Sequence, residues 1–243
     1  MQQVENKLAT PTAEFKVVEF DAGGEKVKLS PNIIKRYLVS GGGNVTDQEI
    51  TMFLNLCRYQ HLNPFLREAY LIKFGTSPAT MVTGKDVFTK RAKRNKMFKG
   101  FEAGVIVIDK DGKAINRTGT FKMPDDVLSG GWAKVYIDGF SVPIEMTVQL
   151  DEYIGRKGNG EVNSQWQKKP ATMIRKVALV QALREAFPED FQGMYSQEEF
   201  VEAQDVALDA TPVPTQEVGN LPNQTQDIPE QSADEPQQYD PLA

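Results

Sequence analysis

One helix limits how this chain can fold more than any other feature of its sequence. Between Pro170 and Pro188, apolar residues recur at helical spacing and also fill most of the opposite side. The first set is Met173, Val177, Val180, Leu183 and Phe187, and the second is Ile174, Leu179 and Ala186. Proline is accepted in the first turn of a helix but not in its interior. The pattern therefore predicts a helix that is buried nearly all round, with the rest of the fold packed against it.

Four cations gather at the N-terminal end of this helix, where the helix dipole already places partial positive charge. They are Lys168, Lys169, Arg175 and Lys176, and Trp166 lies beside them in the sequence. Any one of them is explained equally well by an aliphatic stem that carries its charge out to water. All four together, next to an indole that can stack, favour a phosphate-bearing ligand.

The net charge of −5 averages two unlike parts of the 243-residue chain. Residues 202–243 hold nine acids and no Lys or Arg, which leaves 28 basic and 24 acidic residues in the first 201. This acidic tail is too polar to bury and is predicted to be disordered. The sequence shows no apolar run that could cross a bilayer and no signal-peptide core, so we expect a cytoplasmic protein with no membrane partner.

The first segments of the chain predict small elements that end in a glycine run. Residues 14–20 and 26–29 have strand character and flank a hairpin turn, Asp21-Ala22-Gly23-Gly24. Ser30-Pro31 predicts the cap and first turn of a short helix through Val39, and residues 41–43 are all glycine. We therefore divide the chain into an N-terminal element with a flexible link (1–43), a core (44–201) and the acidic tail (202–243).

Two helices are predicted next, separated by strands at 68–74 and 79–82. Thr46 and Glu49 have the spacing of a capping box for the first helix. Thr83 is predicted to cap the second, which runs through Lys96. Its cations cover about half of the circumference of the helix, and they include Lys85, Lys90 and Lys93. Such a one-sided positive surface favours a polyanion over the alternative, an ordinary solvated face.

The residues that follow predict a hairpin-rich sheet with strands at 101–108, 113–121, 132–138 and 142–149. In the third strand Trp132, Lys134 and Tyr136 share one face, which suits either bases stacked beside a charged backbone or packing against a helix. A polar, glycine-rich loop at 155–165 carries Arg156 and Lys157 and is predicted to be mobile until a ligand binds. The fold class is therefore α+β, a small β-hairpin-rich sheet backed by the long buried helix.

The sequence gives little support for catalysis. Gly84-Lys85 is followed by Asp86 and lacks the spacing of a phosphate-binding nucleotide loop, so ATP use is not supported. Two aspartate pairs lie in turns where aspartate is favoured for backbone reasons, Asp109 with Asp111 and Asp125 with Asp126. We therefore predict no cofactor and no enzyme, and no motif supports a divalent cation.

Four segments of the chain resemble the phage RecT/Redβ single-strand annealing recombinases, of the Bet branch. The segments are HLNPFLREAYLIK (61–73), MVTGKDVFTKRAKRNKMFKGFE (81–102), the strand pair around residues 136–152, and SQWQKKPATMIRKVALVQALREAFPEDFQGMYSQEE (164–199). They occur in order across residues 46–200. Within them LNPF, WQ-x-x-P-x-x-M and R-x-A-F…G-x-Y-x-x-E are specific in combination.

The resemblance implies a protein that coats single-stranded DNA, holds the complementary strand and anneals the two without ATP, as a ring or helical filament. By position, Lys134 and Arg175 match groove residues of the family, and Trp166 with Lys168 matches the turn before the groove helix. Charge alone adds the helix after residue 83. The candidate DNA contacts are Lys85, Lys90, Lys93, Lys134, Tyr136, Arg156, Lys157, Trp166, Lys168, Lys169, Arg175 and Lys176.

The chain departs from the Redβ pattern after residue 200, where that branch has a folded module that contacts an exonuclease. Candidate partners are single-stranded DNA, the annealed duplex intermediate, further copies of the chain, a phage exonuclease and a host single-stranded DNA-binding protein. Two other classes stay open. A passive single-strand binding protein would slow the pairing of complementary strands, and a metal-dependent nuclease would need clustered carboxylates, which the predicted core does not show.

Overall fold

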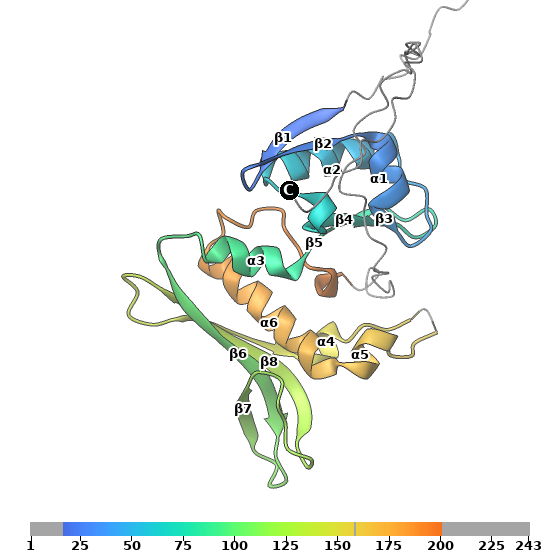
Figure 1. Ribbon diagram of the computed structural model, residues 1–243. Helices are drawn as coiled ribbons and strands as arrows, with labels where there is room; N and C mark the ends of the chain where they lie inside the picture. The colour runs from blue at the N-terminus through green and yellow to red at the C-terminus, as the bar shows by residue number, and fades with distance from the viewer. Residues whose placement is uncertain (1–16, 158, 201–243) are drawn as a thin grey trace, which may run out of the picture. The chain divides into compact units, whose positions relative to one another are not determined.

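The computed structural model describes residues 17–157 and 159–200, which form an α+β fold with three separate sheets (Figure 1). The helices are α1 (Pro31–Tyr37), α2 (Asp47–Tyr59), α3 (Lys85–Ala92), α4 (Leu150–Tyr153), α5 (Ser164–Lys168) and α6 (Pro170–Ala186), with short 3-10 helices η1 (Pro64–Leu66) and η2 (Gln197–Glu199). The strands are β1 (Val18–Ala22), β2 (Glu25–Leu29), β3 (Val39–Ser40), β4 (Ala69–Ile72), β5 (Thr80–Thr83), β6 (Phe98–Ile108), β7 (Ala114–Thr118), β8 (Val127–Ile137) and β9 (Ile144–Gln149). The predicted fold class is confirmed, and the predicted acidic tail lies outside the described residues.

The first hairpin and the short helix after it are present with different bounds from those predicted: Asp21 and Ala22 belong to β1 rather than to the turn, and α1 ends at Tyr37 rather than at Val39, which begins β3. β1 pairs with β2 in antiparallel register, and the turn between Ala22 and Glu25 consists of Gly23 and Gly24 at φ of 67° and 92°. A two-residue hairpin turn of this kind needs positive φ at both positions, which glycine supplies without strain. Ser30 then caps α1, since its Oγ accepts a hydrogen bond from Ile33 N at 3.3 Å.

The small sheet β3-β4-β5 is tied to α2 through Glu49. Thr46 and Glu49 form the predicted capping box, with the Thr46 N–H donating to the carboxylate at 2.8 Å. The same carboxylate accepts from Lys73 Nζ at 2.8 Å and from Ala79 N at 2.7 Å. Burial raises the pKa of Glu49, but these hydrogen bonds outweigh it and lower the pKa to about 2. One ionised side chain thereby joins α2 to both ends of the segment between β4 and β5.

The glycine run at 41–43 packs against the same lysine, because Gly43 N donates to Lys73 O at 2.9 Å. A Cβ at Gly43 would lie 2.8 Å from that carbonyl oxygen, so the approach needs glycine. Buried side chains from β1 and β2 belong to the same hydrophobic cluster as those of α6. The division of the chain at residue 43 stays a prediction.

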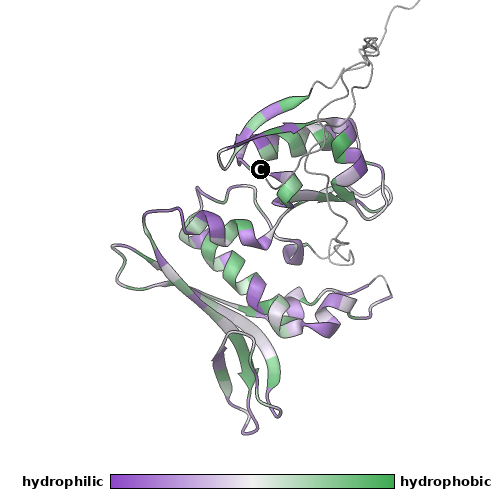
Figure 2. Cartoon of the chain, in the orientation of Figure 1, coloured by the Kyte–Doolittle hydropathy of each residue, from purple (hydrophilic) through white to green (hydrophobic). Residues whose placement is uncertain are grey.

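The third sheet has the strand order β7-β6-β8-β9, all antiparallel, and α6 covers one of its faces (Figure 1). The residues of β8 that point to α6 are Gly131, Ala133 and Val135, and they are buried. Eight hydrophobic residues of α6 are buried along with them, as the long apolar run predicted (Figure 2). Since side chains alternate along a strand, Trp132, Lys134 and Tyr136 lie on the face away from α6. The alternative that this triplet packs against the long helix is therefore wrong.

Gly131 lets α6 come into direct contact with the backbone of β8. A Cβ at this position would lie 2.5 Å from Ile174 O and 3.3 Å from the Ala178 side chain. The helix and the strand are thus close enough at this point that only hydrogen fits between them. This contact sets the height of α6 above the sheet, and with it the position of every side chain that α6 carries.

Two local predictions need correction. Thr83 does not cap a helix, because it is the last residue of β5, and Gly84 precedes the first turn of α3 without a side-chain cap. The helix also ends at Ala92 rather than Lys96. Within the loop predicted at 155–165, Arg156 and Val162 form an antiparallel bridge and α5 begins at Ser164, while the mobility of the loop stays a prediction.

Replacement of Gly131 by alanine should destabilise the fold, because a methyl group would have to displace a helix backbone rather than a side chain. We expect the free energy of unfolding to fall by about 2 kcal/mol, measured by chemical denaturation. Thr147→Ala, an exposed position on the opposite face of β9, should change it by less than about 0.5 kcal/mol. A Gly131→Ala variant as stable as the parent would contradict the close contact.

Acid should weaken the fold through Glu49. Its folded pKa lies below the ordinary value of 4.5, at about 2, so its contribution is full above pH 4.5 and is lost as the pH falls towards 2. Glu49→Gln should lower the free energy of unfolding at pH 7 by about 3 kcal/mol, and the gap to the parent should narrow towards pH 2. Asp47→Asn, which removes the exposed partner of Lys35, should cost less than about 1 kcal/mol. If the difference in free energy of unfolding between the parent and Glu49→Gln does not change with pH, the charge of Glu49 is not the cause of that difference.

Candidate nucleic-acid interface

The corner between α5 and α6 separates a buried indole from two exposed lysines. Asn163 caps α5, since its Oδ1 accepts from the backbone N–H groups of Gln165 and Trp166 at 3.1 Å each. This cap turns Trp166 into the core, where the side chain is 1% exposed. The expectation that its ring stacks on a ligand is therefore wrong in this structure. Lys168 and Lys169 are exposed and form no ion pair within residues 17–157 and 159–200.

Helix α6 distributes its cations over more than one surface. Lys169 and Lys176 are seven residues apart, which places them on one side of the helix at a separation of about 10 Å. Arg175 points elsewhere, because its Nε donates to Ala103 O of β6 at 3.2 Å. The single cluster that the sequence predicted around Arg175 and Lys176 is thus divided between the sheet and the opposite side of α6.

Carboxylates that follow α6 in the chain neutralise two of its cations. Lys176 pairs with Glu198, and Arg184 pairs with Glu199, whose side chains are 5% and 8% exposed. Burial raises the pKa of Glu199, and the hydrogen bond from Ser196 N and the charge of Arg184 oppose that shift. Neither acid was identified from the sequence, because no spacing rule relates η2 to a helix that ends more than ten residues earlier.

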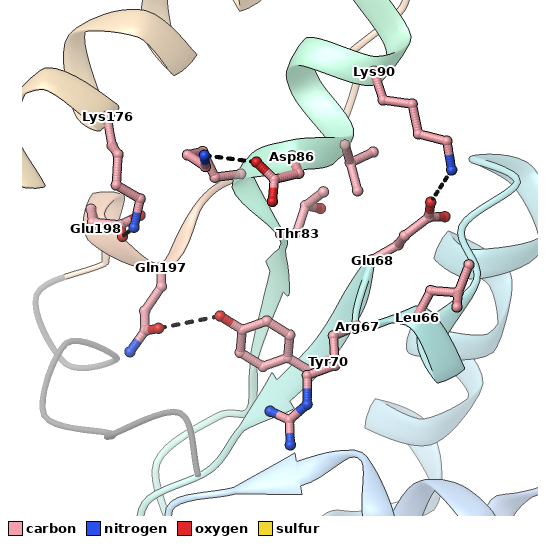
Figure 3. Close-up of a pocket in the computed structure, with 13 residues that line it drawn as sticks. Leu66, Arg67, Glu68, Tyr70, Thr83, Asp86, Lys90, Lys176, Gln197 and Glu198 are labelled. Carbon is pink, nitrogen blue, oxygen red and sulfur yellow. Dashed lines mark hydrogen bonds and ion pairs between the residues drawn. The ribbon is translucent and has the colours of Figure 1, made fainter. Parts of the chain in front are cut away.

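Cations from α3 and α6 meet at one pocket of about 460 Å³ (Figure 3). Lys85, Lys90 and Lys176 line it, so three predicted contacts from distant parts of the sequence lie together. Each is paired with an acid that also lines the pocket: Lys85 with Asp86 at 2.7 Å, Lys90 with Glu68 at 2.7 Å, and Lys176 with Glu198. The fourth cation of the pocket is Arg67, which sequence reasoning missed.

The sheet face away from α6 carries mixed charge. Lys134 Nζ lies 3.3 Å from the Glu145 carboxylate on β9, and Glu102 of β6 is its register partner on the other side. Tyr136 is half-buried on the same face. Trp132 is 5% exposed and its Nε1 donates to Arg117 O at 3.2 Å. Direct contact of Lys134 and Tyr136 with DNA stays a prediction.

The remaining predicted contacts lie outside the pocket. Lys157 pairs with Glu161 at 3.3 Å, and Arg156 Nη1 donates to Gly160 O at 3.2 Å, so both hold their own hairpin together. Hydrogen bonds from Asn159 and Lys157 lower the pKa of Glu161. Lys93 follows the end of α3, is exposed, and has no ion pair in the described part of the chain.

Two further features of the described residues bear on the candidate chemistry. Within residues 17–157 and 159–200, His, Cys, Asp and Glu do not gather in a group of three that would hold a metal ion. The helices in this same part of the chain are too short or too polar to span a membrane. The arrangement instead offers exposed and pocket-lining cations, which bind phosphate groups through charge-assisted hydrogen bonds.

Comparison with known proteins identifies a family for most of the chain. The model of the RecT family matches residues 26–212. An uncharacterised protein of Ureaplasma parvum serovar 3 is 29% identical over 136 residues, which are 56% of this chain and 52% of the relative. The chain therefore spans about half the length of the curated relative that it matches. The family match, which covers α6 and the pocket together, shows that the chain belongs to the RecT family of single-strand annealing recombination proteins.

Proposed function

We propose that this chain binds single-stranded DNA without sequence preference and anneals complementary strands without ATP, acting as an oligomer. The observation that carries the proposal is the pocket where Lys85 and Lys90 of α3 meet Lys176 of α6. Lysines bind phosphates, which position a strand but do not read its sequence. A site built from such contacts holds a strand by its backbone and leaves the base edges free to pair.

Annealing does not require the protein to catalyse a chemical reaction, because duplex formation is itself favourable. The protein has to bring two strands together and hold many bases in line at once. Subunits placed side by side supply this alignment, since each raises the effective concentration of the next stretch of strand. Exposed Lys168 and Lys169 at the α5–α6 corner extend the positive surface beyond the pocket.

The ion pairs of the pocket make each phosphate contact an exchange of partners. A phosphate that reaches Lys176 replaces the Glu198 carboxylate, and one that reaches Lys90 replaces Glu68. The net gain for each contact is small, because one charged hydrogen bond is broken when another forms. Binding then depends on many subunits that share one strand. The protein partners of such an assembly, a phage exonuclease and a host single-stranded DNA-binding protein, and its cytoplasmic location stay predictions.

An annealer and a passive coat differ in how they change the pairing rate. Two complementary dye-labelled oligonucleotides, mixed without ATP, should pair faster with the full chain than without it. The reason is that the bound strands keep their base edges exposed. Stopped-flow energy transfer between the dyes measures the rate. Slower pairing would identify a passive single-strand binding protein, and shortening of the DNA in magnesium would identify a nuclease.

Neutralising the two exposed lysines of the α5–α6 corner should reduce the salt dependence of DNA binding. Each lost phosphate contact lowers the slope of log affinity against log salt by about 0.7 on single strands, so Lys168→Gln with Lys169→Gln should lower it by about 1.4. Fluorescence anisotropy with an oligo-dT strand at several salt concentrations gives the slope. The matched control is Lys26→Gln with Lys28→Gln, two lysines that pair with Glu19 on the first hairpin. If the parent, the Lys168/Lys169 variant and the control variant show the same slope of log affinity against log salt, the α5–α6 corner does not contact DNA.

A further inference from the structure

The hydroxyl group of Thr83 is buried in the pocket of Figure 3, and it has no hydrogen-bond partner among residues 17–157 and 159–200. Thr83 is 1% exposed, and its backbone N–H donates to Tyr195 O at 2.8 Å, which fixes the residue at the end of β5. Buried hydroxyl groups nearly always have a partner, because leaving one without is costly. A ligand that occupies the pocket and accepts a hydrogen bond would satisfy Thr83.

The N-terminus of α3 opens into the same pocket. Gly84, Lys85, Asp86 and Val87, which form its first turn, all line it. No side chain caps this turn. The first backbone N–H groups of a helix have no acceptor within it, and the helix dipole favours negative charge there. Gly84 N donates to Glu68 O and Val87 N donates to Gly84 O, at 3.0 Å each. The N–H groups of Lys85 and Asp86, together with the Thr83 hydroxyl, are therefore the donors that the pocket offers to a ligand.

Close packing holds this end of α3 against the turn that carries Arg67. Gly84 N donates to Glu68 O at 3.0 Å, and a Cβ at Gly84 would lie 2.7 Å from Arg67 O. Arg67 itself has a left-handed backbone with φ of 55°, an arrangement that non-glycine residues adopt only when their surroundings require it. Arg67 lines the pocket, but its guanidinium points away from Thr83 and from the lysines of α3 and α6 (Figure 3).

The charges of the pocket point to an anion. Four cations and three carboxylates line it. The Glu68 and Glu198 side chains are 14% and 5% exposed and each is turned to one lysine, whereas Asp86 is 89% exposed beside Lys85. The lining is therefore positive by one charge, and its donors are a hydroxyl and backbone amides. Phosphate is the anion whose several oxygen atoms accept from such a set at once.

We propose that this pocket binds one phosphate group of a DNA strand, with the Thr83 hydroxyl and the first amides of α3 as donors and Lys85 and Lys176 as counter-charges. The proposal rests on the proposed function for the source of the phosphate. Two sources share this chemistry, a phosphodiester within the strand and a phosphate at a strand end. The volume of about 460 Å³ also leaves room for the sugar attached to it.

Thr83→Val tests the pocket, because valine has the shape of threonine and lacks the hydroxyl. We expect the affinity of the full-length variant for a short oligo-dT strand to fall about tenfold, the loss of one hydrogen bond to a charged group. The melting temperature without DNA should stay the same or rise, since the hydroxyl has no partner in the free protein. Thr51→Val, at an exposed threonine of α2 that bonds to Asp47 O, should leave the affinity unchanged.

Three versions of the strand identify the source of the phosphate. One is unmodified, one carries a 5′-phosphate and one a 3′-phosphate. A loss of affinity in Thr83→Val that is equal for all three assigns the pocket to an internal phosphodiester, and a loss confined to one phosphorylated strand assigns it to that end. Affinities equal to those of the parent for all three strands would overturn the proposal.

Inorganic phosphate separates this proposal from the proposed function. It should raise the melting temperature of the parent and of Thr51→Val more than that of Thr83→Val, because a ligand that binds the folded state stabilises it. If the parent binds no DNA but phosphate still raises its melting temperature more than that of Thr83→Val, the annealing function is refuted and the phosphate pocket is supported. Equal phosphate effects in parent and Thr83→Val, with DNA binding intact, would refute the pocket and keep the function.

Discussion

The contact between the backbones of α6 and β8 at Gly131 is the constraint on which the rest of the structure depends. Because only hydrogen lies between the strand and Ile174 O, the helix is held at a fixed height and rotation above the sheet. That rotation sends Arg175 to β6 and Lys176 to α3. It also brings Arg184 to η2. A fold of short strands and small hairpins thereby acquires one rigid axis from which charged side chains extend in defined directions.

Elements whose formation depends on neighbouring residues could be predicted from the sequence. The capping box at Thr46, the Gly23-Gly24 turn of the first hairpin and the apolar run of α6 each depend on residues within a few positions of one another. Thr83 shows where such reasoning ends. It is a good cap residue by type, but its backbone N–H is bonded to Tyr195 O, more than a hundred residues away, and this contact keeps it in β5. Tertiary hydrogen bonds override a preference worth only about 1 kcal/mol.

The candidate interface was predicted less well, because the sequence does not show where a charged side chain points or which acid it pairs with. Lysines on α3 and α6 were predicted as DNA contacts, which stays a prediction, and three of them line one pocket. Their partners Glu68 and Glu198 were not foreseen, nor was the burial of Trp166, which follows from the Asn163 cap rather than from the indole itself. Hydrophobic periodicity identifies which face of a helix or strand is buried. Only the packing of the elements shows which residues contact each face.

The paired state of the pocket lysines fits the function proposed above, because a lining that is positive by one charge suits reversible contacts better than tight storage of one strand. In the proposed mechanism, phosphates would compete with carboxylates already in place, so a subunit would gain little from any one contact and would release it readily. A strand bound through many such exchanges can shift along the protein until its bases meet their complements. In the proposed mechanism, duplex formation supplies the free energy for annealing, and the Lys176–Glu198 and Lys90–Glu68 pairs would re-form where the strand leaves the protein.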